Sequence, residues 1–178
     1  MRRDSGQACT IMMEPSSVHA NEKDRLLCNL RSLPDELVDL AGSLDDQALR
    51  WRPIPTKWSV KEILGHLRDF ELETMHLRYR SILTEDDPFL PRLDNEAKQQ
   101  EHDYINLDGG GLLDQIRRLR LESIAVLEGA PAESWSRTGR HFSAGRMTLE
   151  QVVARHVRHD MTHLSQIRDI LGLKLPSR

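Results

Sequence analysis

The sequence predicts an all-α protein, an antiparallel four-helix bundle with a long crossover between its second and third helices. Aromatic residues make up only 4% of the 178 residues and β-branched runs are scarce, which argues against β-sandwiches and barrels. Several stretches instead repeat leucine, isoleucine or valine at the spacing of one face of an amphipathic helix. Proline and glycine separate these stretches, so the chain divides into four principal helices.

The first helix is expected to begin near Asp24, where leucines recur at alternating steps of four and three residues. Pro34 interrupts this stripe, because a proline removes an interior hydrogen bond and clashes with the preceding turn. The pattern therefore predicts either a kink or a second segment at Pro34, and an end at Gly42. Residues 1–20 lack a sustained pattern, which predicts a flexible tail ahead of one domain spanning 21–178.

The second helix is expected to start at Ser59, which has capping-box spacing to Glu62. A short turn and a proline-rich linker precede it over residues 43–55, and its apolar stripe continues to about Leu83. The polar span 87–107 then predicts a long connection, with a partial helix around residues 95–102.

The third helix is expected to follow Asp108 and to end at Gly129. The three glycines after Asp108 do not match a phosphate-binding loop, because no Gly-Lys-Ser/Thr sequence follows and no strand precedes them. After a loop that reaches Arg146, Thr148 and Gln151 form a second capping box. They predict a long fourth helix that ends near residue 172.

The charge balance excludes several classes of partner. With 25 Lys and Arg against 28 Asp and Glu, the net charge of −3 gives no basic field, so no nucleic-acid partner is expected. The apolar runs are too short to span a membrane, and a soluble, cytoplasmic protein without a membrane partner is expected.

Cys9 and Cys28 lie far apart, which suggests neither a disulfide framework nor a zinc ribbon. One local basic cluster stands against the overall balance, at Arg117, Arg118 and Arg120.

Three histidines are expected to face the core. His159 and His163 lie four residues apart on the apolar stripe of the fourth helix, and His66 lies on that of the second. Three imidazoles plus a water form the usual catalytic zinc site with an open fourth position. That position is expected to face a cavity at one end of the bundle. The alternative is that each inward histidine is simply hydrogen-bonded within the core, because buried polar groups usually find partners. The spacing of His159 and His163 does not decide between the two, since a chain with eight histidines often has such a pair by chance.

His156 also faces roughly inward. It could replace His163 as a metal ligand, or it could contact one of the metal-binding residues without binding the metal itself. The string from His159 to His163 resembles the HExxH motif of metalloproteases only superficially, since Asp160 is shorter than Glu and no later histidine completes the longer motif. Asp160 is expected either to orient a ligand or a water, or to belong to a solvated charged face. The remaining histidines are expected at the surface: His19, His76, His102 and His141.

Two stretches resemble the signatures of the DinB-like, or YfiT-like, metal-binding four-helix bundles. The first is WSVKEILGHLRD over residues 58–69, and the second runs from Thr148 to Ile167 with an HDxxHLxQI ending. The likeness covers about residues 24–172. It implies one divalent metal ion, zinc or nickel, on His66, His159 and His163, whereas His156 matches no ligand position.

The resemblance also implies an activity: a metal-dependent enzyme that activates a water or a low-molecular-weight thiol for a small-molecule substrate, as a hydrolase or a thiol S-transferase. Relatives include a maleylpyruvate isomerase, and the family name refers to DNA-damage induction rather than DNA binding. The alternatives are a non-catalytic metal- or small-ligand-binding bundle with a stress-related role, and a homodimer formed through an exposed helix face. No general base is assigned. Candidate helpers are Glu62, Asp69, Asp160 and Gln166, and candidate pocket walls are Trp51, Trp58 and Tyr104.

Overall fold

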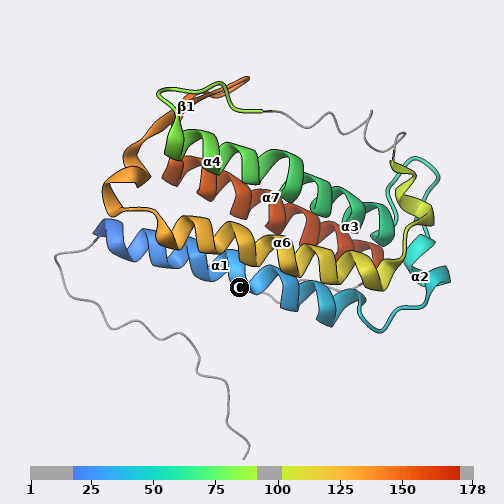
Figure 1. Ribbon diagram of the computed structural model, residues 1–178. Helices are drawn as coiled ribbons and strands as arrows, with labels where there is room; N and C mark the ends of the chain where they lie inside the picture. The colour runs from blue at the N-terminus through green and yellow to red at the C-terminus, as the bar shows by residue number, and fades with distance from the viewer. Residues whose placement is uncertain (1–17, 92–101, 173–178) are drawn as a thin grey trace, which may run out of the picture.

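The computed structural model describes residues 18–91 and 102–172, and four long helical segments dominate it (Figure 1). The second of these segments is continuous but changes its helix type twice. In chain order the segments are α1 (Val18–Ala41); α3 (Val60–Asp69) with the π-helix η1 (Phe70–Met75) and α4 (His76–Thr84); α6 (Gly109–Gly129); and α7 (Leu149–Ile170).

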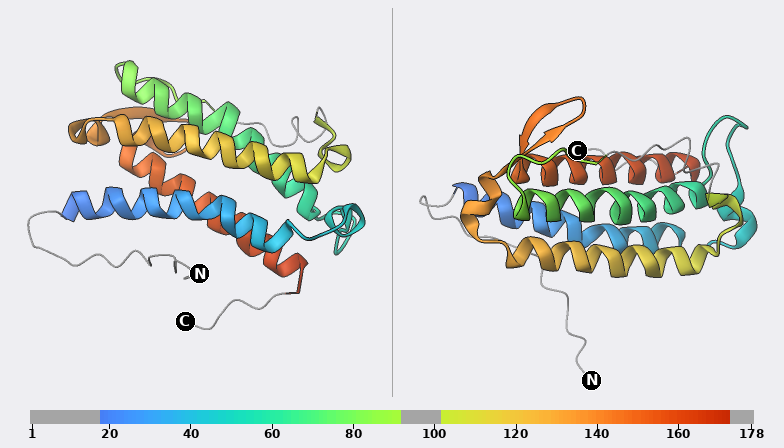
Figure 2. Two further views of the ribbon diagram at one scale, coloured as in Figure 1. Left: turned by 60° about the horizontal axis from the view of Figure 1, so that its bottom comes forward. Right: turned by 45° about the horizontal axis from the view of Figure 1, so that its top comes forward.

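The segments form a bundle in which α1 and α3 each contact both α6 and α7. Figures 1 and 2 show that α1 and α7 run in one direction, and that the α3–α4 segment and α6 run in the other. α4 therefore ends at one end of the bundle and α6 begins at the other. This confirms the predicted bundle and its crossover, and the crossover places the second and third helices parallel to each other.

α1 continues through Pro34 as a single helix from Val18 to Ala41, so it is not split into two segments. Leu30, Leu33 and Leu37 are buried on either side of the proline, and their packing compensates for the lost backbone hydrogen bond. Residues 18–20, assigned to the tail from the sequence, belong to this helix. The domain boundary itself stays a prediction.

The shorter elements close the ends of the bundle. They are α2 (Asp46–Arg50), η2 (Tyr104–Asn106), η3 (Ala132–Ser136) and an antiparallel hairpin of β1 (Thr138–His141) and β2 (Gly145–Thr148). The hairpin falls where the sequence predicted only a loop. Its strands have four residues each, too short to show an alternating pattern, and Gly145 has the positive φ that its turn requires. The partial helix predicted over 95–102 lies almost wholly outside the described residues.

Both predicted capping boxes are present. Ser59 accepts from the backbone of Glu62 at the start of α3, and Thr148 accepts from that of Gln151 at the start of α7. In turn, the side-chain oxygens of Glu62 and Gln151 accept hydrogen bonds from the backbone N–H groups of Ser59 and Thr148. In the described part of the chain, no helix is both long and apolar enough to cross a membrane.

The buried apolar side chains form two clusters, one toward each end of the bundle. All four helical segments pass from one cluster to the other, and three of them carry a buried charged residue at the boundary. Glu71 lies between Leu67 and Met75, Arg120 between Ile116 and Ile124, and Asp160 between Val157 and Leu164. The bundle thus has a polar layer between two apolar regions, beside the predicted histidines.

Candidate metal centre

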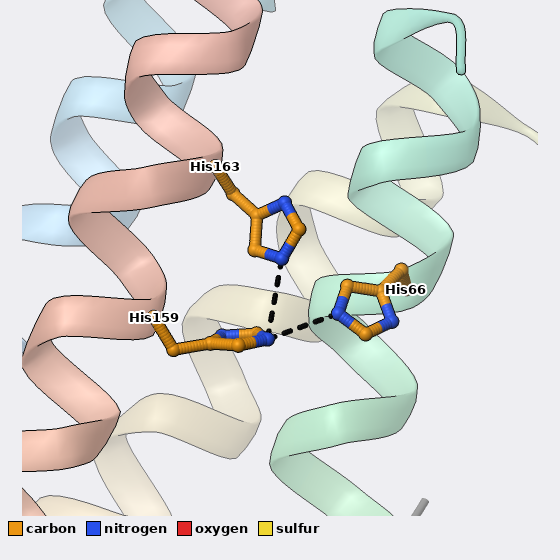
Figure 3. Close-up of side chains that lie close together, drawn as sticks. All are labelled: His66, His159 and His163. Carbon is orange, nitrogen blue, oxygen red and sulfur yellow. Dashed lines mark hydrogen bonds between the residues drawn. The ribbon is translucent and has the colours of Figure 1, made fainter. Parts of the chain in front are cut away.

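The three predicted histidines converge on one point (Figure 3). Nε2 of His159, on α7, lies 3.0 Å from Nε2 of His66, on α3, and 3.2 Å from Nε2 of His163, one turn further along α7. His66 and His163 are buried, and His159 is partly exposed. The structure therefore brings together ring nitrogens from two helices, although His66 and His159 are 93 residues apart in sequence.

Hydrogen bonds alone do not account for this arrangement. Nδ1 of His163 donates to Oε1 of Gln166 at 2.8 Å, so in the neutral ring Nε2 carries a lone pair. Nε2 of His159 faces both other rings but can carry a single proton, which satisfies one neighbour at most. Separations of this size are close to the roughly 3.4 Å expected between two nitrogens that bind one tetrahedral zinc ion. The donor set fits a single cation.

The surroundings keep the imidazoles in the neutral form that binds metals. Burial, followed by the nearby charges of His163 and His159, lowers the pKa of His66 to about 2. Burial and the charge of His159 lower the pKa of His163 to about 4. The pKa of His159 is also lowered, mainly by burial. At neutral pH no proton has to be displaced from these rings before a metal binds.

Aromatic rings fix the orientation of the histidines. Phe70 stacks on His159 with ring centroids 3.8 Å apart and planes 18° apart. Trp58 lies parallel to His163 with centroids 6.3 Å apart, and it also contacts His66. These contacts limit rotation of the rings, so the site is preorganised.

The π-helix η1 begins at Phe70, one turn after His66. A π-turn adds a residue to the helical repeat and changes which side chains face inward, and such turns are common at functional sites. Here Phe70 packs on His159 while the next residue, Glu71, is fully buried toward α6. The irregularity thus lets one helix supply a metal-ligand candidate, a stacking ring and a buried carboxylate.

A cavity of about 560 Å³ opens beside His163. It lies between the linker before α3 and the end of α7. Its walls are partly apolar and carry one positive and one negative side chain, those of Lys57 and Asp169. The lining residues are Pro53, Thr56, Lys57, Trp58, Ile63, His163, Gln166, Asp169 and Ile170. A small molecule seated there would reach the centre from the His163 side.

His156 is not part of this centre. Its Nδ1 is hydrogen-bonded to Oη of Tyr79 at 2.7 Å, and its Nε2 lies 3.1 Å from Nη2 of Arg120. Both ring nitrogens are therefore engaged in the polar layer, one turn of α7 away from His159. The possibility that His156 replaces His163 is not supported by the structure.

The other candidates fall into different places. Glu62 belongs to the capping box and pairs with Arg52, and Trp51 is exposed away from the cavity. Among the candidate wall residues, Trp58 lines the cavity, while Tyr104 is buried against α3. Tyr104 approaches Gly65 so closely that a Cβ there would lie 2.6 Å from its ring.

Asp69 forms a second cluster with Glu73 and His102. Its carboxylate already accepts from the hydroxyl of Tyr104 and contacts Nδ1 of His102, each at 2.6 Å, and it pairs with Arg68 at 2.5 Å. The guanidinium of Arg68 leaves this carboxylate poorly suited to a metal ion.

The expectation of four surface histidines is wrong for His141, which is buried. His76 and His102 are half-buried; His76 is hydrogen-bonded to the carbonyl oxygen of Leu119. The side chain of His19 lies outside the described residues.

Arg120, which the sequence placed in a basic cluster, is buried together with Glu71, for which the sequence predicted no role. Arg120 pairs with Glu71 at 2.8 Å and with Asp160 at 2.7 Å, and Ser123 donates to Glu71. A signal was available, because Arg120 lies four residues from both Ile116 and Ile124 and therefore faces the core. Asp160 is likewise buried, so of its two expected roles the solvated charged face is wrong.

Known proteins similar to this chain include several that are named for metal dependence. The DinB superfamily model matches residues 29–167. A "putative metal-dependent hydrolase" of Halalkalibacterium halodurans is 26% identical over 88% of this chain and 91% of the relative. YfiT of Bacillus subtilis, also described as a "putative metal-dependent hydrolase", is 23% identical over 86% of each chain.

Solved structures show the same fold. A structure of YfiT, described as a "probable metal-dependent hydrolase with an unusual four-helix bundle topology", has a TM-score of 0.75 and 22% identity, covering 92% of this chain and 95% of YfiT. A mycothiol-dependent maleylpyruvate isomerase has a TM-score of 0.67 and 11% identity, covering 82% of this chain and 60% of the isomerase. With its family model matched over most of its length, this chain belongs to the DinB superfamily.

Proposed function

We propose that this protein is a metal-dependent hydrolase that holds one divalent ion, zinc or nickel, on His66, His159 and His163. The observation that carries the proposal is the convergence of three Nε2 atoms beside a cavity of about 560 Å³. The relatives described as metal-dependent hydrolases support the same reading.

The chain's own residues have distinct roles. The three imidazoles hold the ion, and Gln166 keeps the proton of His163 on Nδ1. Trp58 and Ile63 form an apolar wall that limits water around the substrate. Lys57 and Asp169 offer opposite charges to a small molecule with an apolar body and ionised groups. When bound, a divalent ion supplies the acidity that makes a water or a thiol nucleophilic at neutral pH.

A thiol S-transferase is the second candidate. The cavity that would admit a substrate could also admit a low-molecular-weight thiol, and the fold is shared with a mycothiol-dependent isomerase. A purely structural metal site is less well supported, because the described residues that surround the three Nε2 atoms supply no fourth ligand and the cavity reaches His163.

The first experiment is metal analysis of the full chain, with a chelator control. We expect about one zinc or nickel ion per chain in the parent and a loss of tightly held metal in His66→Ala and His159→Ala. His76→Ala is the matched control, because His76 bonds a backbone carbonyl outside the centre. Metal retained in the first two variants contradicts the proposed ligands.

The second experiment separates the two activities. Metal-loaded protein is assayed with ester and amide substrates, and then with a thiol and an electrophile. Chelator-sensitive hydrolysis that is lost in His163→Ala supports the hydrolase. If the protein turns over substrate only when a thiol is present, the hydrolase proposal is wrong and the thiol S-transferase takes its place.

A further inference from the structure

The polar layer beside the metal centre contains a carboxylate aimed at one of the proposed ligands. Oδ2 of Asp160 accepts from Nη1 of Arg120 at 2.7 Å. Oδ1 lies 3.9 Å from Nδ1 of His159, and both of these atoms are buried without a hydrogen-bond partner among the described residues. A buried donor and a buried acceptor that face each other unpaired cost free energy until they meet.

We infer that Asp160 is the positioning residue of the metal centre: its Oδ1 accepts the Nδ1 proton of His159 when Nε2 of His159 binds the ion. This inference rests on the proposed metal site. Ligation through Nε2 requires the proton of the neutral ring to be on Nδ1, and a carboxylate is the usual acceptor for such a proton. A small rotation of the Asp160 side chain would close the distance from 3.9 Å to a hydrogen bond.

Arg120 holds this carboxylate in place. Its guanidinium is buried, pairs with both Asp160 and Glu71, and donates toward the backbone carbonyl of Leu30. The carboxylate of Asp160 is thus held by a buried cation at Oδ2, and Oδ1 is left facing His159.

One other group approaches Oδ1 of Asp160. Nε2 of His156 lies 3.6 Å away, but it is also 3.1 Å from Nη2 of Arg120, which can only donate. That nitrogen also lies 3.2 Å from Oε2 of Glu71, so Arg120 and Glu71 are both nearer partners for it than Oδ1 of Asp160 is. His159 remains the donor that Oδ1 can serve.

The substitution Asp160→Asn tests the inference through the ring proton. Because Arg120 can only donate, the amide oxygen must face Arg120, and the amide NH₂ then faces Nδ1 of His159. The proton of His159 is expected to move to Nε2, where it blocks ligation. We expect the affinity for zinc to fall by about 10- to 100-fold, which is the usual effect of removing a hydrogen-bond partner of a metal-binding histidine.

The measurements are zinc competition against a chelator, side-chain ¹⁵N NMR of the metal-free full chain, and thermal unfolding. The parent is expected to show the Nδ1–H form of His159, and Asp160→Asn the Nε2–H form. Asp114→Asn, an exposed carboxylate on α6, controls for the lost charge. Ser123→Ala removes a hydrogen bond to Glu71 in the same layer and is expected to lower Tm with little change in zinc affinity.

Each result decides between the readings. A change of ring proton together with a selective loss of affinity supports the positioning role. Unchanged affinity, or a loss without a change of ring proton, overturns it, as does an equal loss in Ser123→Ala. A parent that binds neither zinc nor nickel overturns the proposed metal site instead, while the NMR of the metal-free protein still reports on the contact between Asp160 and His159.

Discussion

Acidification of the metal-free protein should reveal the buried histidines as a loss of stability. His66 and His163 have an ordinary pKa of 6.5, which the folded protein lowers to about 2 and about 4. Well above pH 6.5 both rings are neutral in the folded and in the unfolded protein, so they do not change the free energy of unfolding with pH. As the pH falls through 6.5, the unfolded chain takes up protons that the folded protein cannot, and stability falls.

The size of this loss follows from the two pKa values. At about pH 5, each ring lies about 1.5 pH units below its unfolded pKa and remains neutral in the folded protein. At about 1.4 kcal/mol per unit, each contributes a loss of about 2 kcal/mol, and the two together about 4 kcal/mol. This is a large share of the stability of an ordinary domain.

Urea unfolding at about pH 8 and about pH 5, with a chelator present, measures the effect. The substitution His66→Gln should reduce the acid-dependent loss by about 2 kcal/mol, because one of the two buried imidazoles is gone. Ser43→Ala, at an exposed position without a titratable group, should behave as the parent. An equal loss in the parent and in His66→Gln would refute the argument that burial holds this ring neutral.

Three further predictions concern the bundle and its surface. Arg120→Met leaves Glu71 and Asp160 buried without their cation, and should lower the free energy of unfolding by about 3–5 kcal/mol in urea titrations; a loss below 1 kcal/mol would contradict the ion-pair reading. Gly65→Ala places a Cβ 2.6 Å from the ring of Tyr104, and should lower stability by about 1–3 kcal/mol, measured in the same way; an unchanged midpoint would mean that Tyr104 moves freely. Duplex DNA should not bind at physiological salt, because Arg120 of the sequence's basic cluster is buried and Arg117 pairs with Asp35; micromolar, salt-sensitive binding by fluorescence anisotropy would contradict this.

The helices and the inward direction of all three proposed ligands follow from the sequence, because both depend on neighbours along the chain. Capping boxes join residues three apart, and His159 and His163 lie on one face because four residues make about one turn. His66 was placed inward by the same periodicity on its own helix. These relations need no knowledge of how the helices pack.

The partners across helices were decided by the tertiary structure. The sequence left His156 and His163 as alternatives, and the choice depends on Tyr79 and Arg120, which reach His156 from two other helices. The hairpin and the π-turn at Phe70 were likewise absent from the sequence pattern. A helical period shows that a residue faces inward, whereas burial of an ionised group such as Arg120 depends on counter-charges that only packing brings within reach.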